Sequence, residues 1–314
     1  MRHPAEEISD HVRVGLALSG GGARGLAQIG VLKVFERHRL PVHLIAGTSI
    51  GAIVGALYAC YEDADEVERR VLETLSSEHM AGIDLDRILK LSGIAPTQQR
   101  DQPPESPGLL ERAQRLIRRV VASHAALTRL AVLDGDTVLG VYDRLYEGRT
   151  FDQTRIPFAA VAVDLEEGRE VVVASGSLAR GVAASSAIAG IFPPVEIQGR
   201  RLVDGGYTSP VPIDVTYALG ANVVIAVDVS HRDLDRGRLE NAVEVAMRSS
   251  EISLLALERE QLRRADVIVP VRGRARHWSD YSDPAEAIAA GEEAAERMVP
   301  SIRVAIEERG SLFI

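Results

Sequence analysis

The sequence predicts an α/β protein of three layers, in which helices cover both faces of a central, mainly parallel sheet, followed by a helical C-terminal extension. Apolar runs of strand length alternate with helix-length segments along the 314-residue chain. Each of the first two apolar runs ends in a turn bracketed by glycines, and a helical segment follows each turn. This order of elements is typical of parallel βα units. A hydrophobic content of 46% is sufficient for a buried core.

The N-terminal part supplies the first two βα units. Arg13–Leu18 is the apolar run of a buried strand, and Gly25–His38 has the apolar spacing of a helix. Val42–Ala46 predicts a second strand and Ile50–Cys60 an apolar helix. The residues expected to face inward on the first helix are Leu26, Ile29, Leu32, Val34 and Phe35.

The middle of the chain is expected to be mainly helical. Helices are predicted at Asp63–Ser76, Asp84–Leu91 and Thr137–Tyr146. Pro96–Gly108 combines four prolines with polar residues, so we expect a loop there. Leu109–Leu130 predicts a basic amphipathic helix, because five arginines oppose an apolar face.

The rest of the chain contains two predicted hairpins and further helices. Glu166-Glu167-Gly168-Arg169 separates the strands of the first hairpin, and Gln198-Gly199-Arg200 separates those of the second. The expected strands are Phe158–Asp164, Glu170–Ala174, Val195–Ile197, Arg201–Val203, Asn222–Asp228 and Val267–Val271. The expected helices are Leu178–Ala187 with Ser177 as its N-cap, Pro212–Leu219, Ala242–Leu262 and Pro284–Glu308.

These elements suggest one main domain. We expect a tail over residues 1–12, the main domain over 13–230 with its proline-rich loop at about 96–108, and an extension over 231–314 that packs on the same domain.

Composition excludes several classes of function. A net charge of −9 and only 4% aromatic residues disfavour nucleic-acid binding. The single cysteine, Cys60, cannot form an internal disulfide or a cysteine-built zinc site. The N-terminus has no apolar segment typical of a signal peptide. These features favour a cytoplasmic protein, with peripheral contact to the inner face of the membrane as an open alternative.

The first glycine turn is Ser19-Gly20-Gly21-Gly22-Ala23-Arg24-Gly25. Its spacing matches the dinucleotide fingerprint, but the second strand ends in Ala46-Gly47-Thr48-Ser49, without the acidic residue that binds ribose. It is not a P-loop, since no Gly-Lys-Ser/Thr follows. Backbone N–H groups at a helix N-terminus can instead hold an oxyanion. A purely structural turn is the alternative.

The second glycine turn is Gly47-Thr48-Ser49-Ile50-Gly51, the pattern of a nucleophile elbow. An α/β-hydrolase would place a histidine in the C-terminal half, where this chain has only His231 and His277. Both stand in charged runs typical of a surface. Ser49 as an ordinary helix N-cap is the alternative.

Asp204 is the candidate for the missing base. It ends the second predicted hairpin and is followed by Gly205 and Gly206, which allow close backbone approach. A carboxylate has a reference pKa of about 3.9, so burial would have to raise the pKa for a useful base. By itself, Asp-Gly-Gly could simply be a turn.

The three motifs in this order resemble the patatin-like phospholipase family, most strongly its bacterial members related to the catalytic domain of neuropathy target esterase. The likeness extends over about residues 13–230, including Ala184–Val195 before the aspartate and Gly205–Pro212 after it. One departure is Gln28, where many relatives carry histidine, and we expect altered local hydrogen bonding there.

The resemblance implies a Ser–Asp dyad, with Ser49 as nucleophile and Asp204 as proton acceptor. The backbone N–H groups of Gly21, Gly22, Ala23 and Arg24 would form the oxyanion hole. Hydrolysis of phospholipid or lysophospholipid acyl esters through an acyl-enzyme is implied, without a cofactor or metal. Ser185 and Ser186 lack flanking glycines and are expected to pack beside the site, and Asp228 is expected to be structural.

Two questions stay open in the sequence. Leu109–Leu130 carries a local charge of 5 − 1 = +4 and could either dock on an anionic bilayer or pack on the core. A non-catalytic binding or regulatory protein on a patatin scaffold is the alternative to a hydrolase. The oligomeric state is not predicted.

Overall fold

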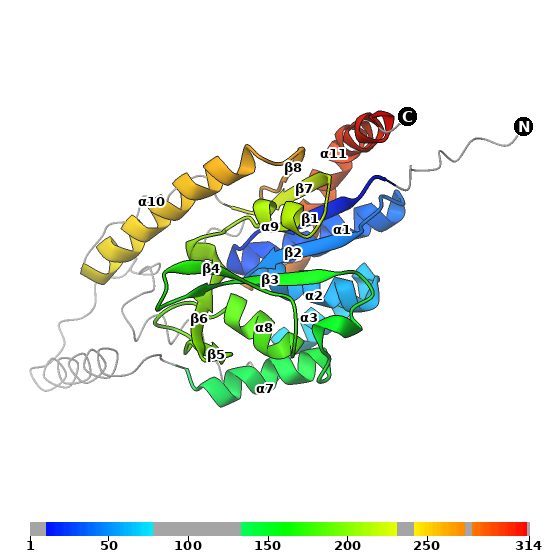
Figure 1. The fold of residues 1–314 in the computed structure, drawn as a ribbon. Helices are drawn as coiled ribbons and strands as arrows, with labels where there is room; N and C mark the ends of the chain where they lie inside the picture. Colours follow the sequence, from blue (N-terminus) through cyan, green and yellow to red (C-terminus); the bar gives the residue numbers. More distant parts are fainter. Residues whose placement is uncertain (1–10, 78–132, 231–241, 274–277, 313–314) are drawn as a thin grey trace, which may run out of the picture.

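The computed structural model describes residues 11–77, 133–230, 242–273 and 278–312 (Figure 1). The elements expected at Asp84–Leu91, Pro96–Gly108 and Leu109–Leu130 lie outside these residues. Within the described ranges, the expected three-layer α/β architecture is confirmed.

An eight-stranded sheet forms the centre of the molecule, with the order β5-β6-β3-β2-β1-β7-β8 and β4 paired with β3. The segment from β3 to β8 is parallel, whereas β4, β5 and β6 add antiparallel pairs at one side. The strands are β1 (Val14–Leu18), β2 (Leu44–Thr48), β3 (Phe158–Asp164), β4 (Arg169–Val173), β5 (Val195–Ile197), β6 (Arg200–Asp204), β7 (Val223–Asp228) and β8 (Val267–Pro270).

Helices cover both faces of this sheet. Figure 1 shows α9 and α10 on one side and α2, α3, α7 and α8 on the other. The α-helices are α1 (Ala27–Arg37), α2 (Ile50–Tyr61), α3 (Ala64–Ser76), α7 (Gly135–Tyr146), α8 (Leu178–Ser185), α9 (Ile213–Ala218), α10 (Ala242–Leu262) and α11 (Pro284–Ser311). Short 3-10 helices are η1 (Gly22–Leu26), η2 (Phe151–Gln153) and η3 (Gly205–Tyr207).

Strand β1 contributes apolar side chains to the cores on both faces of the sheet. Leu16 and Leu18 belong to the main core cluster, whereas Ala17, between them, belongs to the second cluster on the opposite face. This is the two-residue alternation of a strand that is buried on both sides.

Side-chain caps fix the beginnings of several helices. Asp63, Asp134 and Asp283 each accept a hydrogen bond from a backbone N–H in the first turn of α3, α7 and α11. Ser177 caps α8 as predicted, by accepting from the N–H of Arg180 at 3.3 Å.

The C-terminal part contributes to the same layers. Strand β8 pairs with β7, and α11 packs against α1. A Cβ on Gly30 would collide with the carbonyl of Ile288, and one on Gly291 with the carbonyl of Ala27. These two glycines therefore allow α1 and α11 to approach closely.

Several boundaries differ from the prediction by one to three residues, and two of these differences lie at the candidate site. Strand β2 extends to Thr48, because Gly47 and Thr48 still pair with Ala160 and Val161 of β3. Helix α8 ends at Ser185, two residues earlier than predicted, and the residues that follow it turn toward β6.

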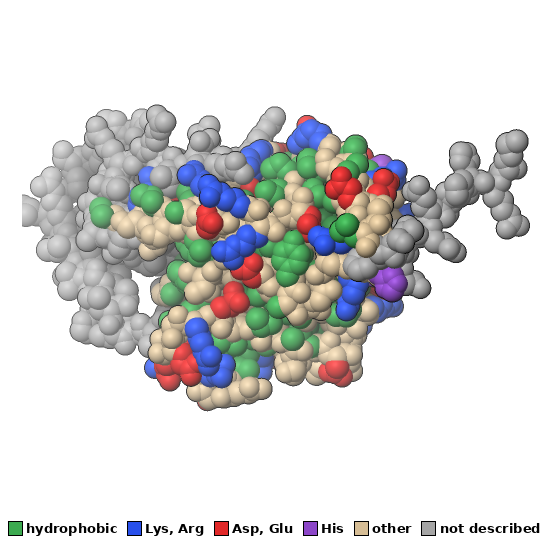
Figure 2. Space-filling model, turned by 45° about the horizontal axis from the view of Figure 1, so that its top comes forward, with side chains coloured by type: hydrophobic (Ala, Val, Ile, Leu, Met, Phe, Trp, Pro, Cys, Tyr) green, Lys and Arg blue, Asp and Glu red, His purple; other side chains and the backbone are tan. Residues whose placement is uncertain are grey.

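The described helices include none with the length and apolar run needed to cross a bilayer. Figure 2 shows acidic and basic side chains interspersed on the visible face, so the described part of that face does not carry charge of one sign alone.

Candidate active site

Ser49 lies in a strained turn between β2 and α2. Its φ of 56° and ψ of −122° are unfavourable for a residue with a Cβ. A Cβ on Gly47 would collide with the Gly51 carbonyl, and one on Gly51 with the Leu18 carbonyl. The glycines flanking Ser49 are therefore required by close backbone contacts. Such a strained conformation costs about 1–3 kcal/mol and persists only when its surroundings enforce it.

The residues at the end of α8 hold the backbone of Ser49. The Ser49 N–H donates to Ser185 Oγ at 3.0 Å, and Ser186 Oγ donates to the Ser49 carbonyl at 3.3 Å. Ser185 Oγ in turn donates to the Val161 carbonyl of β3 at 2.6 Å. The expectation that both serines pack beside Ser49 agrees with these contacts.

Asp204 meets Ser49 at the end of β6. The Asp204 side chain is only 5% exposed, and its carboxylate accepts hydrogen bonds from the Ser49 side chain and from the Gly206 N–H, the latter at 2.7 Å. Burial raises the pKa of Asp204 to about 6, although both hydrogen bonds act to lower the pKa. The carboxyl group is therefore poised to exchange a proton near neutral pH.

The sheet register explains why these distant residues meet. Val161 of β3 pairs with Thr48, and the next residue, Ala162, pairs with Asp204 of β6. Because β3 runs parallel to β2 and antiparallel to β6, the C-terminal ends of β2 and β6 lie at neighbouring positions on β3. The order of strands in the sheet, which pairs distant segments, thus creates the Ser49–Asp204 contact.

The glycine turn lies directly beside Ser49. A Cβ on Gly20 would be 3.5 Å from the Ser49 Cβ. Gly21 and Gly22 have φ angles of 151° and 60°, which favour glycine. The N–H of Ala23 donates to the Trp278 carbonyl at 2.6 Å, so this amide already has an acceptor.

Arg24, Gln28 and Asp228 surround the turn. Arg24 donates to the Gly21 carbonyl at 3.3 Å, and burial lowers the pKa of its guanidinium. Gln28 donates to the Ser19 carbonyl at 2.7 Å, while its buried Oε1 has no hydrogen-bond partner within the described structure. Asp228 binds Ser230 and Arg272 at the end of β7.

A segment after Asp204 connects the motifs, and sequence reasoning did not identify its role. The Gly20 N–H donates to the Pro210 carbonyl at 2.9 Å, and Thr48 Oγ1 donates to the Ser209 carbonyl at 2.7 Å. Gln261 of α10 donates to the Thr208 carbonyl at 3.0 Å and accepts from the Val211 N–H at 3.2 Å. No local pattern marks Gln261, because its partners are set by the tertiary fold.

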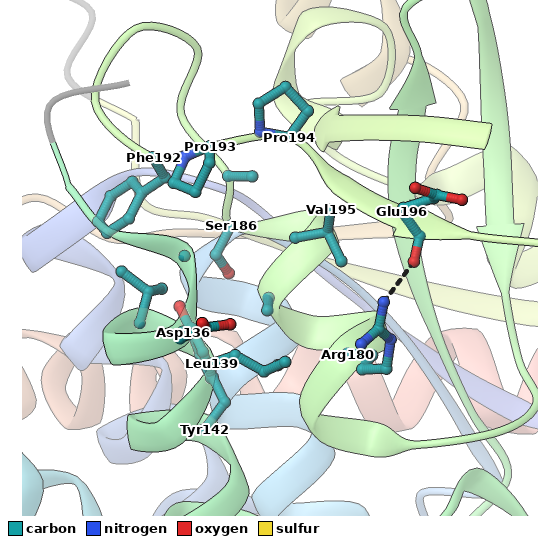
Figure 3. Close-up of a pocket in the computed structure, with 14 residues that line it drawn as sticks. Asp136, Leu139, Tyr142, Arg180, Ser186, Phe192, Pro193, Pro194, Val195 and Glu196 are labelled. Atoms are coloured by element: carbon teal, nitrogen blue, oxygen red, sulfur yellow. Dashed lines mark hydrogen bonds between the residues drawn. The ribbon is translucent and has the colours of Figure 1, made fainter. Parts of the chain in front are cut away.

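A mainly apolar pocket of about 160 Å³ lies between α7, the end of α8 and residues 192–196 (Figure 3). Ser186 and Ala187 line it, and these two residues contact Ser49 and Asp204 through hydrogen bonds. Arg180, which donates to the Glu196 carbonyl at 2.6 Å, stands at the pocket edge. Other lining residues are Gly135, Asp136, Val138, Leu139, Tyr142, Ala183, Phe192, Pro193, Pro194, Val195 and Glu196.

A serine hydroxyl on a buried carboxylate, next to a glycine turn at a helix start, is an arrangement suited to acyl transfer. A family model described as patatin-like phospholipase matches residues 16–217. The chain belongs to the patatin-like phospholipase family. The family predicted from the three sequence motifs is thereby confirmed.

Several curated relatives share this part of the patatin-like chain. Patatin-like phospholipase domain-containing protein 6 of Homo sapiens is 31% identical over 222 residues, which are 70% of this chain and 14% of that protein. Lysophospholipase NTE1 of Mycosarcoma maydis is 31% identical over 221 residues, covering 70% of this chain and 10% of that protein. The matches therefore span a small part of these longer proteins.

Among solved structures, VipD from Legionella pneumophila is similar with a TM-score of 0.47 and 14% identity. That likeness covers 93% of this chain and 67% of VipD.

Proposed function

We propose that this chain is a serine hydrolase of lipid acyl esters, of the phospholipase A or lysophospholipase type. The observation that carries the proposal is the hydrogen bond between the Ser49 hydroxyl and the buried Asp204 carboxyl, at the start of α2. Family membership and the names of the relatives support a phospholipid or lysophospholipid as the substrate.

In the first half of the reaction, Ser49 Oγ attacks the ester carbonyl carbon while its proton passes to Asp204. The resulting tetrahedral oxyanion collapses, the bond to the leaving alkoxide breaks, and Asp204 gives that alkoxide its proton. The product is an acyl ester on Ser49. A pKa near 6 suits Asp204 to both transfers, since a group of this pKa takes and returns protons readily at neutral pH.

In the second half, Asp204 takes a proton from water, and the hydroxide oxygen attacks the acyl carbon. The bond to Ser49 then breaks, and Ser49 Oγ recovers the proton from Asp204. The free fatty acid leaves and the starting state returns.

The oxyanion is proposed to bind the N–H groups of the glycine turn. Gly21 and Gly22 are the donors we favour, because the Ala23 N–H contacts the Trp278 carbonyl and the Arg24 N–H is at the first hydrogen-bonded position of the 3-10 helix η1. Ala23 would join them only if that carbonyl moved away. Fixed amide dipoles of this kind stabilise charge that develops in the transition state.

The acyl chain is proposed to enter the apolar pocket beside Ser186. A cavity of similar size, about 150 Å³, holds one benzene molecule. The described pocket of about 160 Å³ would therefore accept roughly six carbon atoms of an acyl chain. Contact of Leu109–Leu130 with a bilayer lies outside the described residues and stays a prediction.

The dyad is tested with Ser49→Ala and Asp204→Asn, compared with the unaltered chain. We expect each variant to lose at least about 10³-fold in turnover of p-nitrophenyl butyrate and lysophosphatidylcholine, because removing a nucleophile or its base leaves only binding and electrostatic effects. A fluorophosphonate probe should label the unaltered chain at Ser49, as read by peptide mass spectrometry, and leave Ser49→Ala unlabelled.

Circular dichroism and thermal unfolding serve as the folding controls for both variants. Absence of labelling and turnover in the unaltered, folded chain would overturn the proposal and favour the non-catalytic binding protein instead.

A further inference from the structure

We infer that the three consecutive residues Ser185, Ser186 and Ala187 form a positioning segment, which holds Ser49 in its strained conformation and fixes its separation from Asp204. This inference rests on the proposed function, since it assigns a role in the same reaction. None of the three residues is proposed to react with substrate.

Ser185 fixes the N-terminal side of Ser49. Its buried Oγ accepts from the Ser49 N–H at 3.0 Å and donates its own proton to the Val161 carbonyl at 2.6 Å. One hydroxyl can donate only one proton, so this geometry uses the donor on β3 and leaves the lone pair for Ser49. Ser185 thereby anchors the Ser49 N–H to strand β3 of the central sheet.

Ser186 fixes the C-terminal side of Ser49. Its Oγ donates to the Ser49 carbonyl at 3.3 Å, and Tyr142 lines the apolar pocket together with Ser186 (Figure 3). The Tyr142 and Ser186 hydroxyls are near enough to interact, so Tyr142 restrains the position of Ser186.

Ala187 connects the same segment to Asp204. The Asp204 N–H donates to the Ala187 carbonyl at 3.0 Å. The two serines thus contact the peptide groups on both sides of Ser49, and the next residue contacts the backbone of Asp204. A movement of this segment would change the spacing of Ser49 and Asp204 directly.

The positive φ of Ser49 explains why these contacts are needed. A non-glycine residue at φ 56° and ψ −122° relaxes toward a more favourable conformation unless its peptide groups are held. Relaxation would rotate the Ser49 side chain away from Asp204. A displacement of about 1 Å at a reacting group can lower a rate about 100-fold.

The experiment compares Ser185→Ala, Ser186→Ala and Tyr142→Phe with Ser177→Ala as a matched control. Ser177 is on the same helix and its hydroxyl also accepts a backbone N–H, but that N–H belongs to Arg180 and not to Ser49. Turnover of p-nitrophenyl butyrate, fluorophosphonate labelling rate and thermal unfolding are measured for each. Ser186→Thr retains the hydroxyl and serves as the rescue variant.

We expect Ser185→Ala and Ser186→Ala to lower kcat about 10- to 100-fold with KM changed less than about twofold, since the nucleophile is misplaced while the pocket remains. The labelling rate should fall in the same proportion. Tyr142→Phe should show a smaller loss of kcat, and Ser186→Thr should recover most of the rate. Ser177→Ala should keep the kcat of the unaltered chain even where its melting temperature falls.

The inference is overturned if Ser185→Ala and Ser186→Ala keep their kcat and labelling rate, or if Ser177→Ala loses as much as they do. Should Ser185→Ala not fold, the comparison of Ser186→Ala with Ser186→Thr decides the question, because both variants keep the contacts of Ser185. An active unaltered chain with unaffected variants overturns the positioning segment alone. An unaltered chain without turnover or labelling overturns the proposed function first.

Discussion

At the scale of single residues, the decisive property is the environment of one carboxyl group. Asp204 lies at 5% exposure, and burial raises its pKa to about 6 against the effect of two hydrogen bonds. The same side chain at a surface would be fully ionised at neutral pH and a weak base. In the proposed reaction, burial therefore supplies the basicity that a histidine supplies in a Ser-His-Asp triad.

This pKa predicts opposite pH dependences for activity and for the stability contribution of Asp204. The value of kcat/KM for p-nitrophenyl butyrate should be level above about pH 6 and fall about tenfold per pH unit below it, because Asp204 must be ionised to accept a proton. The folded-state pKa lies above the unfolded value, so the contribution to stability is fully present below about pH 4. It is lost as the pH rises through 6, by on the order of 2–3 kcal/mol.

Asp204→Asn isolates the stability effect. At pH 8 this variant should have a higher free energy of unfolding than the unaltered chain, and the difference should shrink toward pH 4, as measured by urea unfolding. A difference that is independent of pH would contradict the raised pKa. A pH-independent kcat/KM between pH 5 and 7 would contradict the role of Asp204 as the base.

At the scale of elements, α7 and α8 shape the pocket that Ser186 lines. Val138, Leu139 and Tyr142 recur at helical spacing on α7 and line the pocket, while Ala183 and Ser186 line it from α8 and its end. The sequence predicts the apolar face of α7 but does not show that α7 and α8 together line a cavity. Packing in three dimensions decides that.

Filling this pocket should change acyl-chain preference. Val138→Phe is expected to lower kcat/KM for p-nitrophenyl octanoate roughly tenfold more than for the acetate ester, because about two methylenes lose burial at about 0.8 kcal/mol each. Val141→Phe, on α7 but not among the pocket-lining residues, is the matched control. Equal effects on both esters in Val138→Phe would place the acyl chain elsewhere.

At the scale of the whole molecule, the C-terminal helix supports the layer that carries the glycine turn. Helix α11 packs along α1 and also contacts η1, which begins at Gly22. Gly30 and Gly291 set the closest approach, where any Cβ would meet a backbone carbonyl. Residues far from Ser49 in the chain therefore determine where the proposed oxyanion donors lie.

Gly291→Ala is expected to destabilise the fold by about 1–3 kcal/mol, because the added methyl group forces two packed helices apart. The midpoint of thermal unfolding measures this effect. Gly310→Ala is the matched control on the same helix, since its Cβ would meet only Val12 at an ordinary 3.6 Å. That control should be neutral or stabilising through helix propensity, and equal losses in both variants would contradict the close-packing argument.

The sequence by itself determined most elements, since apolar period and glycine position act locally. The strands Phe158–Asp164 and Val195–Ile197 and the helix Ala242–Leu262 have the predicted bounds, and the expected inward face of α1 and its preceding turn is buried. The glycine turns, Ser49 and Asp204 were also readable from local motifs and family resemblance. Cap residues and turn glycines leave a local signature because their partners lie within a few residues.

The tertiary structure decided what brings these motifs together. The pairing of β3 with both β2 and β6 places Asp204 beside Ser49, and no local pattern encodes strand order. The contacts of Ser185 and Ser186 with Ser49, of Gln261 with residues 208–211, and of Trp278 with Ala23 all join residues far apart in the chain. Such contacts, and the burial that raises the pKa of Asp204, exist only once the layers have packed.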